Sequence, residues 1–240
     1  MQSMDYTFAD AACNLALDEV LLGEAGSEGH RETLRFWESP TSFVVLGLTQ
    51  GIQQEVNGEY CKDHNIPIMR RCSAGGCVVQ GPGCLNFTLV LSKDARPEIA
   101  SIHGSYEYIL GKIINVLKIP QLRKAGISDL ALGDLKVSGN AQRRRKDHIL
   151  HHGTLLYNAD IPLFSSFIRE PQDRPEYRGS RAHDAFITNL AVSRDFLVQS
   201  VSEAFEVDLA TDNPGKALIE ESRRLAEDKY EQKSWIYRKT

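Results

Sequence analysis

A glycine-rich segment from Arg70 to Gly83 is the first place where the residue types suggest chemistry. It reads RRCSAGGCVVQGPG, so two arginines precede small residues that let a backbone approach a ligand closely. Guanidinium groups complement carboxylates and phosphates. No Gly-Lys-Ser/Thr follows, as a Walker loop requires, and no helix is expected after it, as a dinucleotide fingerprint requires. Taken alone, the segment fits either an anion-binding loop or a plain turn between two strands.

A lysine on an expected strand is the second candidate. The segment GDLKVSGNAQ, residues 133–142, predicts a strand, and alternation would place Lys136, Ser138 and Asn140 on one face. That face would carry an ammonium, a hydroxyl and an amide. The alternative is an exposed strand edge with a solvated lysine.

Three histidines fall within the segment HILHHGTLLYN, residues 148–158, and invite a metal interpretation. Strand alternation, however, places His148 and His152 on one side and His151 on the other, which converges poorly on a tetrahedral ion. No cysteine lies nearby to complete such a site. We therefore expect structural or substrate-contacting histidines and no metal centre.

Composition narrows the classes of function. The 240 residues hold 28 Lys plus Arg against 32 Asp plus Glu, and the resulting charge of −4 argues against a general nucleic-acid binder. The apolar runs are too short to span a bilayer, and the first residues lack the pattern of a signal peptide. Five cysteines without a C-x-x-C pair suggest reduced thiols, all within the first 84 residues. These features predict a cytoplasmic protein with no membrane partner.

Strands in runs, interrupted by single helices, are expected to position the three segments. The helix over 10–25 carries an apolar stripe, with Asp18 and Glu19 on its other side. The basic cluster Arg143–Lys146 is expected at a hairpin tip. Further helices are predicted at 54–64, 99–117, 161–168, 193–206 and 214–232, and strands at 34–37, 43–47, 66–69, 86–91, 127–132, 135–142 and 149–157. This pattern predicts an α+β domain with a mostly antiparallel or mixed sheet.

Together the segments resemble the lipoate–protein ligase A family. RRxSxGGxV followed by LNFT, then GDxKVSGxAQ, a basic turn and HHGTLLYN occur in the family's order, and the resemblance covers about residues 10–190. It implies the α+β catalytic fold of the biotin/lipoate ligases, with a central mixed or antiparallel sheet flanked by helices. It further implies one such domain over residues 1–240, without the C-terminal accessory domain that many members carry.

The resemblance also implies a two-step reaction. Lipoate or octanoate attacks ATP, with Mg²⁺, to give an acyl-AMP, and a lysine of a lipoyl-domain protein such as an E2 subunit or the glycine cleavage H protein then takes the acyl group. Both steps build negative charge on oxygens, where a fixed cation and N–H donors stabilise it. By resemblance, Lys136 is the catalytic lysine. The substrate- and nucleotide-binding residues implied are Arg71, Ser73, Ala74, Gly75, Gly76, Asn86, Asp129, Ser138, Gly139 and His152.

Two departures from the family pattern concern the glycine-rich segment. Ala74 replaces a glycine of the usual triplet, and Gln80-Gly81 replaces a His-Asp pair. We therefore expect altered handling of the nucleotide and consider a separate accessory subunit for adenylate formation.

Two alternatives remain open at this point. An ATP-independent octanoyl- or lipoyl-transferase of the same superfamily needs a nucleophilic thiol facing the lysine, yet neither 126–130 nor any position after Cys84 holds a cysteine. A non-catalytic lipoate-binding domain is the second alternative.

For the basic cluster Arg143–Lys146, we consider both docking of an acidic lipoyl domain and a solvated turn.

Overall fold

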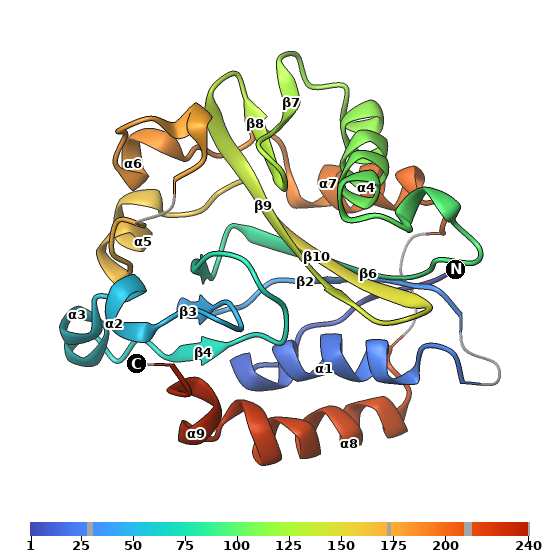
Figure 1. Cartoon of the computed structure of the whole chain (residues 1–240), viewed down its shortest axis with the longest axis horizontal. Coiled ribbons are helices and arrows are strands. Elements are labelled where there is room, and N and C mark those ends of the chain that lie inside the picture. Colours follow the sequence, from blue (N-terminus) through green and yellow to red (C-terminus); the bar gives the residue numbers. More distant parts are fainter. Residues whose placement is uncertain (28–30, 172–173, 209–212, 240) are drawn as a thin grey trace.

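A seven-stranded mixed sheet forms the centre of the computed structural model, which describes residues 1–27, 31–171, 174–208 and 213–239 (Figure 1). β1 and β2 are parallel, and every other neighbouring pair is antiparallel. In spatial order the strands are β1 (Gln2–Asp5), β2 (Thr33–Trp37), β6 (Cys84–Ser92), β10 (His148–Leu156), β9 (Leu135–Arg144), β8 (Asp129–Leu132) and β7 (Leu122–Ala125).

A smaller sheet lies beside the carboxyl end of β2. Its strands are β4 (Ile68–Arg70), β3 (Phe43–Leu46) and β5 (Val78–Gln80), in that order. The first part of the glycine-rich segment, residues 71–77, is a loop that connects β4 to β5, the two edge strands of this sheet, and β5 itself lies within the segment.

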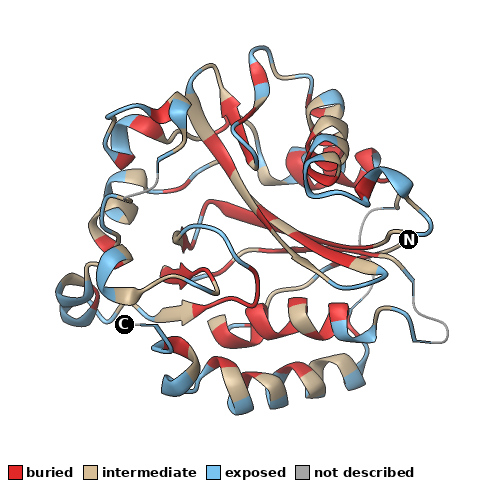
Figure 2. Ribbon diagram, in the orientation of Figure 1, coloured by how far each residue is buried: buried red, intermediate tan, exposed pale blue. Residues whose placement is uncertain are grey.

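Helices cover both faces of the large sheet (Figure 1). Alternate residues of β6 face two different hydrophobic cores. Leu89 and Leu91 pack with α4 (Ile102–Leu117) and α7 (Arg194–Ala204), whereas Val90 packs with α1 (Ala11–Glu24) on the other face. Every residue of β2 is buried, as expected for a strand covered on both faces (Figure 2). The helices are α1 (Ala11–Glu24), α2 (Ile52–Glu55), α3 (Gly58–Asp63), α4 (Ile102–Leu117), α5 (Ile161–Phe167), α6 (His183–Phe186), α7 (Arg194–Ala204), α8 (Lys216–Leu225) and α9 (Lys233–Ile236).

α1 begins where Asp10 caps it by accepting a hydrogen bond from the backbone N–H of Cys13. α8 lies along its outer side (Figure 1), so α1 is enclosed between the sheet and another helix. The prediction of Asp18 on a polar outer side is wrong, because this carboxylate is buried and faces Arg35 of β2 and His152 of β10.

These observations show a single α+β domain with a mixed sheet and flanking helices. Within the described ranges, none of the helices combines the length and apolar character needed to cross a membrane.

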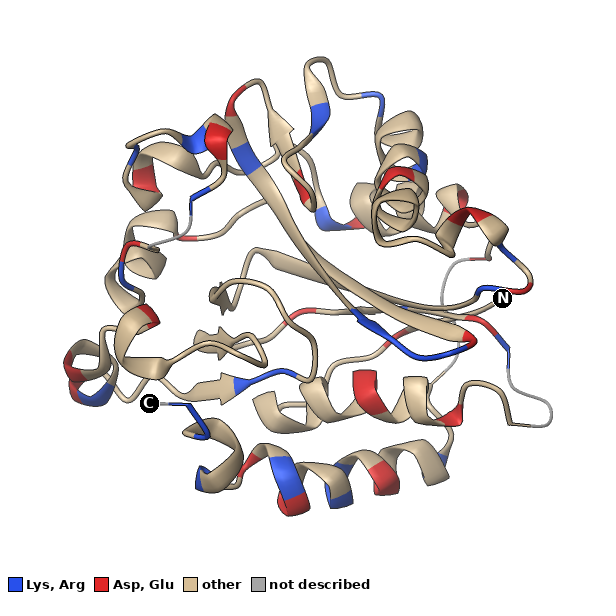
Figure 3. Cartoon of the chain, viewed as in Figure 1, with Lys and Arg blue, Asp and Glu red and all other residues tan. Residues whose placement is uncertain are grey.

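The basic cluster lies at the tip of the β9–β10 hairpin, close to α1 and the start of α4 (Figure 3). Its arginines point back onto the protein. Arg143 donates to the backbone oxygen of Cys72 at 2.7 Å, and Arg145 donates to that of Leu22 at 3.0 Å. Arg144 binds the backbone oxygens that precede α4. The arginines therefore help to anchor the tip, while Arg145 and Lys146 remain exposed. Docking of an acidic lipoyl domain and a solvated turn both stay predictions.

Candidate active site

Lys136 lies in β9 and pairs with Asp129 of β8, with 2.9 Å between Nζ and Oδ1. Tyr177 donates a hydrogen bond to the other oxygen of the same carboxylate at 2.8 Å. Gly139 lies beneath the lysine, because a methyl group there would come within 3.1 Å of Cε and Nζ. The lysine side chain remains 27% exposed. The ammonium is thus held in place and still reachable from outside.

A β-bulge decides which way this lysine points. Ser138 pairs with Leu130 and Lys136 pairs with Ala131, so β9 has one extra residue, Val137, between two consecutive residues of β8. Such a bulge interrupts the alternation of side chains. Lys136 consequently shares the face of Gly139, whereas Ser138 is buried on the opposite face, hydrogen-bonded at 3.1 Å to Asn140. The predicted single face of Lys136, Ser138 and Asn140 is wrong for this reason.

Arg71 organises the glycine-rich loop from inside. Its Nε donates to Ser73 Oγ at 3.0 Å, and its Nη2 donates to the backbone oxygens of Ala74 and Gly76 at 2.8 Å each. Gly75 has a φ of +95°, which a side chain would disfavour. Burial lowers the pKa of Arg71 to about 10, so the guanidinium remains charged at neutral pH. The loop is therefore folded around a buried cation.

Arg70, the other arginine of the pair, does not face a ligand. It is buried and donates to the backbone oxygens of Gly47 and Gln50, at 2.7 and 2.8 Å, and to that of Ile236 at 2.8 Å. The donors of this guanidinium are engaged by carbonyl oxygens, so Arg70 ties the end of α9 to the loop after β3. Of the two arginines, only Arg71 borders the site.

A buried polar chain supports the loop from the sheet side. Asp18 accepts from Arg35 Nη1 at 2.7 Å and contacts His152 Nδ1 at 3.2 Å, and His152 Nε2 lies 2.6 Å from Ser73 Oγ. Burial opposes ionisation of Asp18, yet Arg35 and His152 outweigh it and lower the pKa of the carboxyl. The carboxylate fixes the proton on Nδ1, so Nε2 accepts from the serine hydroxyl. Sequence reasoning missed Asp18 because nothing in a helical stripe distinguishes a buried acid from an exposed one.

His151 lies on the opposite face of β10, as alternation predicted. It is buried between Gln142 and Asn140, at 3.0 and 3.2 Å. Burial, helped by His152, lowers its pKa to about 3, so it is a neutral core residue. In the described ranges, no group of three His, Cys, Asp or Glu side chains is arranged to hold a metal ion.

Thr154 is a site residue that the motifs did not single out. Its hydroxyl donates to Asn86 Oδ1 and accepts from Gln80 Nε2, both at 2.8 Å. Alternation from His152 would have placed it on the same face. Gln80, noted in the sequence as a departure, thus has a definite structural partner.

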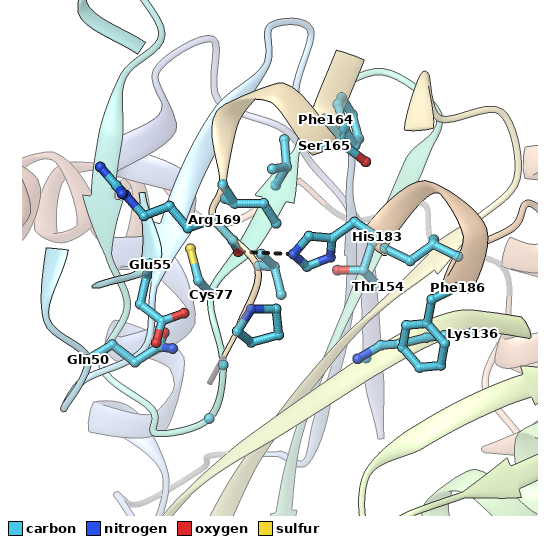
Figure 4. A pocket seen from close by; sticks show the side chains of 18 of the residues that line it. Gln50, Glu55, Cys77, Lys136, Thr154, Phe164, Ser165, Arg169, His183 and Phe186 are labelled. Atoms are coloured by element: carbon cyan, nitrogen blue, oxygen red, sulfur yellow. Dashed lines mark hydrogen bonds between the residues drawn. The ribbon is translucent and has the colours of Figure 1, made fainter. Parts of the chain in front are cut away.

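Two connected hollows meet at Lys136. The inner one, of about 140 Å³, extends between the sheet and α1 and includes the apolar side chains of Leu15, Trp37 and Val45. The outer one, of about 710 Å³, opens between α2, α5 and α6 (Figure 4). Residues that border both are Gly75, Gly76, Cys77, Val78, Lys136, Gly139 and Thr154.

The structure brings most of the predicted residues together here. Those that border a hollow with Lys136 are Arg71, Gly75, Gly76, Asn86, Asp129, Ser138, Gly139 and His152. Ser73 and Ala74 border neither and act through their contacts with Arg71 and His152. Sequence reasoning missed the outer wall, which includes Glu55, Phe164, Arg169, His183 and Phe186. That wall comes from short helices and loops without a recognisable motif.

Cys77 is the thiol that borders both hollows, within the part of the chain that the structure describes. Burial raises the pKa of Cys72, Cys77 and Cys84 to about 12. Since the thiolate is the nucleophilic form, these thiols are unreactive at neutral pH.

Comparisons with known proteins identify the family of the chain. The family model of the lipoyl protein ligase A/B catalytic domain matches residues 10–210. Lipoate–protein ligase 1 of Staphylococcus aureus is 26% identical over 241 residues, which covers 95% of this chain and 70% of that protein.

Solved structures share the fold. A structure of the bipartite lipoate protein ligase and its E2 lipoyl domain from Thermoplasma acidophilum aligns with a TM-score of 0.83 at 24% identity, covering 98% of this chain and 95% of that one. A lipoate–protein ligase A bound with ATP aligns with a TM-score of 0.82 at 24% identity, covering 98% of both chains. With its matched residues and this fold, the chain belongs to the lipoyl protein ligase A/B catalytic domain family.

Proposed function

We propose that this protein attaches lipoate, or octanoate, to a lysine of a lipoyl-domain protein through an acyl-AMP intermediate made from ATP. The observation that carries the proposal is the position of Lys136 at the junction of two hollows, a small inner one that reaches the apolar side chains of Leu15, Trp37 and Val45 and a larger outer one. An acyl chain in the inner hollow would present its carboxylate at this junction, and a nucleotide in the outer hollow would present its α-phosphate there.

The inner hollow suits an alkyl chain. Leu15, Trp37 and Val45 offer apolar surface, and burial of each methylene contributes about 0.8 kcal/mol. Asp18 and His152 border the same hollow, but they are satisfied by each other, by Arg35 and by Ser73. An alkyl chain bound in the inner hollow would therefore meet no unpaired charge from Asp18 or His152.

Lys136 supplies the fixed cation that both steps require. In the first step the carboxylate attacks the α-phosphorus, and the ammonium offsets charge on the reacting oxygens. In the second, the same ammonium stabilises the oxyanion formed when an amine attacks the acyl carbonyl. The salt bridge to Asp129 keeps the ammonium in position between the two steps.

Mg²⁺ enters this scheme with ATP. It prefers oxygen ligands and usually binds substrate phosphates together with one or two carboxylates. Glu55 borders the outer hollow and offers such a carboxylate. When bound, the ion would neutralise charge on the phosphates.

The transferase alternative is less well supported. It requires a thiol that attacks the acyl group, whereas Cys77 is a protonated thiol with a pKa of about 12. The names of the relatives, one of them bound with ATP, also favour a ligase. The acceptor proposed here has the same chemistry as the E2 lipoyl domain that accompanies the Thermoplasma relative.

Lipoate-dependent exchange of labelled pyrophosphate into ATP tests the first step. We expect exchange by the wild-type chain and a fall of about 10²–10³ for Lys136→Ala, the size typical for loss of one such contact. Lys146→Ala, at the exposed hairpin tip, is the matched control and should exchange normally.

Synthetic lipoyl-AMP tests the second step and the need for a partner. Transfer from lipoyl-AMP to a lipoyl domain without exchange would indicate a separate accessory subunit, in line with the relative described as bipartite. Failure of both reactions would contradict the proposal and favour a lipoate-binding domain.

A further inference from the structure

His183 borders the outer hollow that also contains Lys136 (Figure 4). It is the first residue of α6, and only 9% of it is exposed. Its backbone N–H donates to Glu170 Oε1 at 2.9 Å, and its Nε2 lies 3.1 Å from the backbone oxygen of Arg169. Both contacts fix the ring relative to the wall of the hollow. Its Nδ1, in contrast, is buried and has no hydrogen-bond partner in the described part of the chain.

The partner at Nε2 determines the tautomer. A backbone oxygen only accepts hydrogen bonds, so Nε2 carries the hydrogen and Nδ1 carries a lone pair. A buried acceptor without a partner destabilises a fold, and such groups call for a functional explanation. His183 thus carries an unused basic lone pair, buried just behind the lining of the outer hollow, and a turn of the ring would bring it to an amine in that hollow.

Charged groups on several elements face this ring. Burial lowers the pKa of His183; Arg178 and Lys136 lower it further, while the hydrogen bond to Arg169 and the carboxylate of Glu170 act in the opposite direction. The net direction is downward from an ordinary value near 6.5. The imidazole is therefore uncharged at neutral pH and able to accept a proton.

Other acceptors of the lining are less suitable. Both oxygens of Asp129 are engaged, one by Lys136 and one by Tyr177. Gln80 Oε1 is also buried and has no partner among the described residues, but an amide oxygen is not basic enough to take a proton from an amine. Glu55 is a carboxylate of the same hollow and is included in the test below.

We infer that His183 is the general base of amide formation, an inference that rests on the proposed function. The neutral amine of the acceptor lysine attacks the carbonyl carbon of the acyl-AMP, and a C–N bond forms. The proton on the attacking nitrogen passes to Nδ1 of His183. The C–O bond to the phosphate then breaks, AMP leaves with the electron pair, and the imidazolium returns its proton to water.

His183→Gln isolates this role, because its side-chain amide can still donate to the Arg169 oxygen while the lone pair of Nδ1 is lost. General base catalysis contributes about 10²–10⁴-fold. We expect single-turnover transfer from synthetic lipoyl-AMP to a lipoyl-domain lysine to fall by that factor. Pyrophosphate exchange should be unchanged, since no amine takes part in it. His103→Gln, exposed on α4, is the control.

Two further measurements separate a base from a structural residue. Hydroxylamine is uncharged at neutral pH and attacks acyl-AMP without such help, so hydroxamate formation should be the same in His183→Gln and the wild type. Added imidazole should restore lysine transfer in His183→Ala, where it can occupy the vacated space. The rate of transfer by the wild type should fall as pH decreases through the pKa of His183, and this dependence should be absent from both variants.

Several results would overturn the inference. Unchanged lysine transfer by His183→Gln would overturn it. So would losses of pyrophosphate exchange and hydroxamate formation as large as the loss of lysine transfer, because they would mean that His183 orders the nucleotide. Loss of the pH dependence in Glu55→Gln and its persistence in His183→Gln would assign the base to Glu55. If the wild type lacks both exchange and transfer, the proposed function itself fails, a result distinct from those obtained with the variants.

Discussion

Replacing Asp18 by asparagine should destabilise the protein strongly, although the two side chains have nearly the same shape. Asp18 and Arg35 are both buried, with 2.7 Å between their charged atoms. Removal of one partner of a buried ion pair leaves an uncompensated charge and costs about 3–5 kcal/mol. For a chain of this size each kcal/mol lowers Tm by about 2–4 °C, so a fall of about 6–20 °C is expected.

The same substitution should also affect the glycine-rich loop. An asparagine amide facing His152 Nδ1 would move the ring proton to Nε2, which then could no longer accept from Ser73 Oγ. Ser73 holds Arg71, which in turn holds the loop. We therefore expect a raised KM for lipoate in addition to the loss of stability.

Urea unfolding of Asp18→Asn, Asp94→Asn and the double variant Asp18→Asn/Arg35→Met measures these effects. Asp94 is exposed, so its variant should match the wild type within about 0.5 kcal/mol. The double variant should recover part of the stability, because it removes the unpaired charge. A loss below about 1 kcal/mol for Asp18→Asn would refute the reasoning.

The pH dependence has a definite sign. The pKa of Asp18 is lowered in the folded protein, so the ion pair stabilises the fold above the ordinary carboxyl range. That contribution is lost as pH falls below about 4, towards the lowered pKa. Asp18→Asn should therefore show a shallower loss of stability in acid than the wild type.

Three further predictions concern other parts of the site. Replacement of all five cysteines by alanine or serine should leave acyl transfer measurable, and a trapped acyl thioester would contradict this. Gly47→Ala should disrupt the glycine-rich loop, because its Cβ would clash with the backbone oxygen of Gly75, whereas a Cβ at Gly58, the control, meets open space. Thermal unfolding and the KM for ATP would report the difference. A Gly47→Ala protein with unchanged Tm and KM would refute the clash. Arg144→Ala should lower the free energy of unfolding by about 0.5–1.5 kcal/mol in urea, because the part-buried oxygen of Ile99 and the exposed oxygen of Ala100 lose a charged donor. An equal effect of Lys146→Ala would show that the tip is not anchored as described.

Strong periodic signals predicted most of the fold. The helix expected over 10–25 is Ala11–Glu24, and the strands expected over 135–142 and 149–157 are β9 and β10. The expected strand at 127–132 is instead the short β8, preceded by a separate β7. Strands as short as these carry too few residues for alternation to be recognised.

The site was predicted in its residues more than in its geometry. Lys136 could be singled out because a lysine between apolar residues on a strand is unusual. Its orientation depends on a bulge at Val137, which arises from pairing with β8 and has no local signature. In the same way, the burial of Asp18 depends on its contacts with Arg35 of β2 and His152 of β10, which a local helical pattern does not reveal. Tertiary contacts decided both.

The arginines illustrate the same limit. A run of basic residues at a hairpin tip and a pair at a loop both suggested charges offered to a partner. In the structure, Arg70, Arg144 and Arg145 donate to backbone oxygens instead. An arginine has five donors, and unpaired carbonyls at loop and helix ends compete for them. Only the folded chain shows which carbonyls are left unpaired.

The most direct test of the central claim is the mass of a lipoyl-domain acceptor after incubation with lipoate, ATP, Mg²⁺ and the purified protein. Alongside it, AMP and pyrophosphate should be quantified. The account predicts one added lipoyl group per acceptor, with one AMP and one pyrophosphate released for each, and loss of all three products with Lys136→Ala. Modification of the acceptor without release of AMP, or at the wild-type rate by Lys136→Ala, would contradict it.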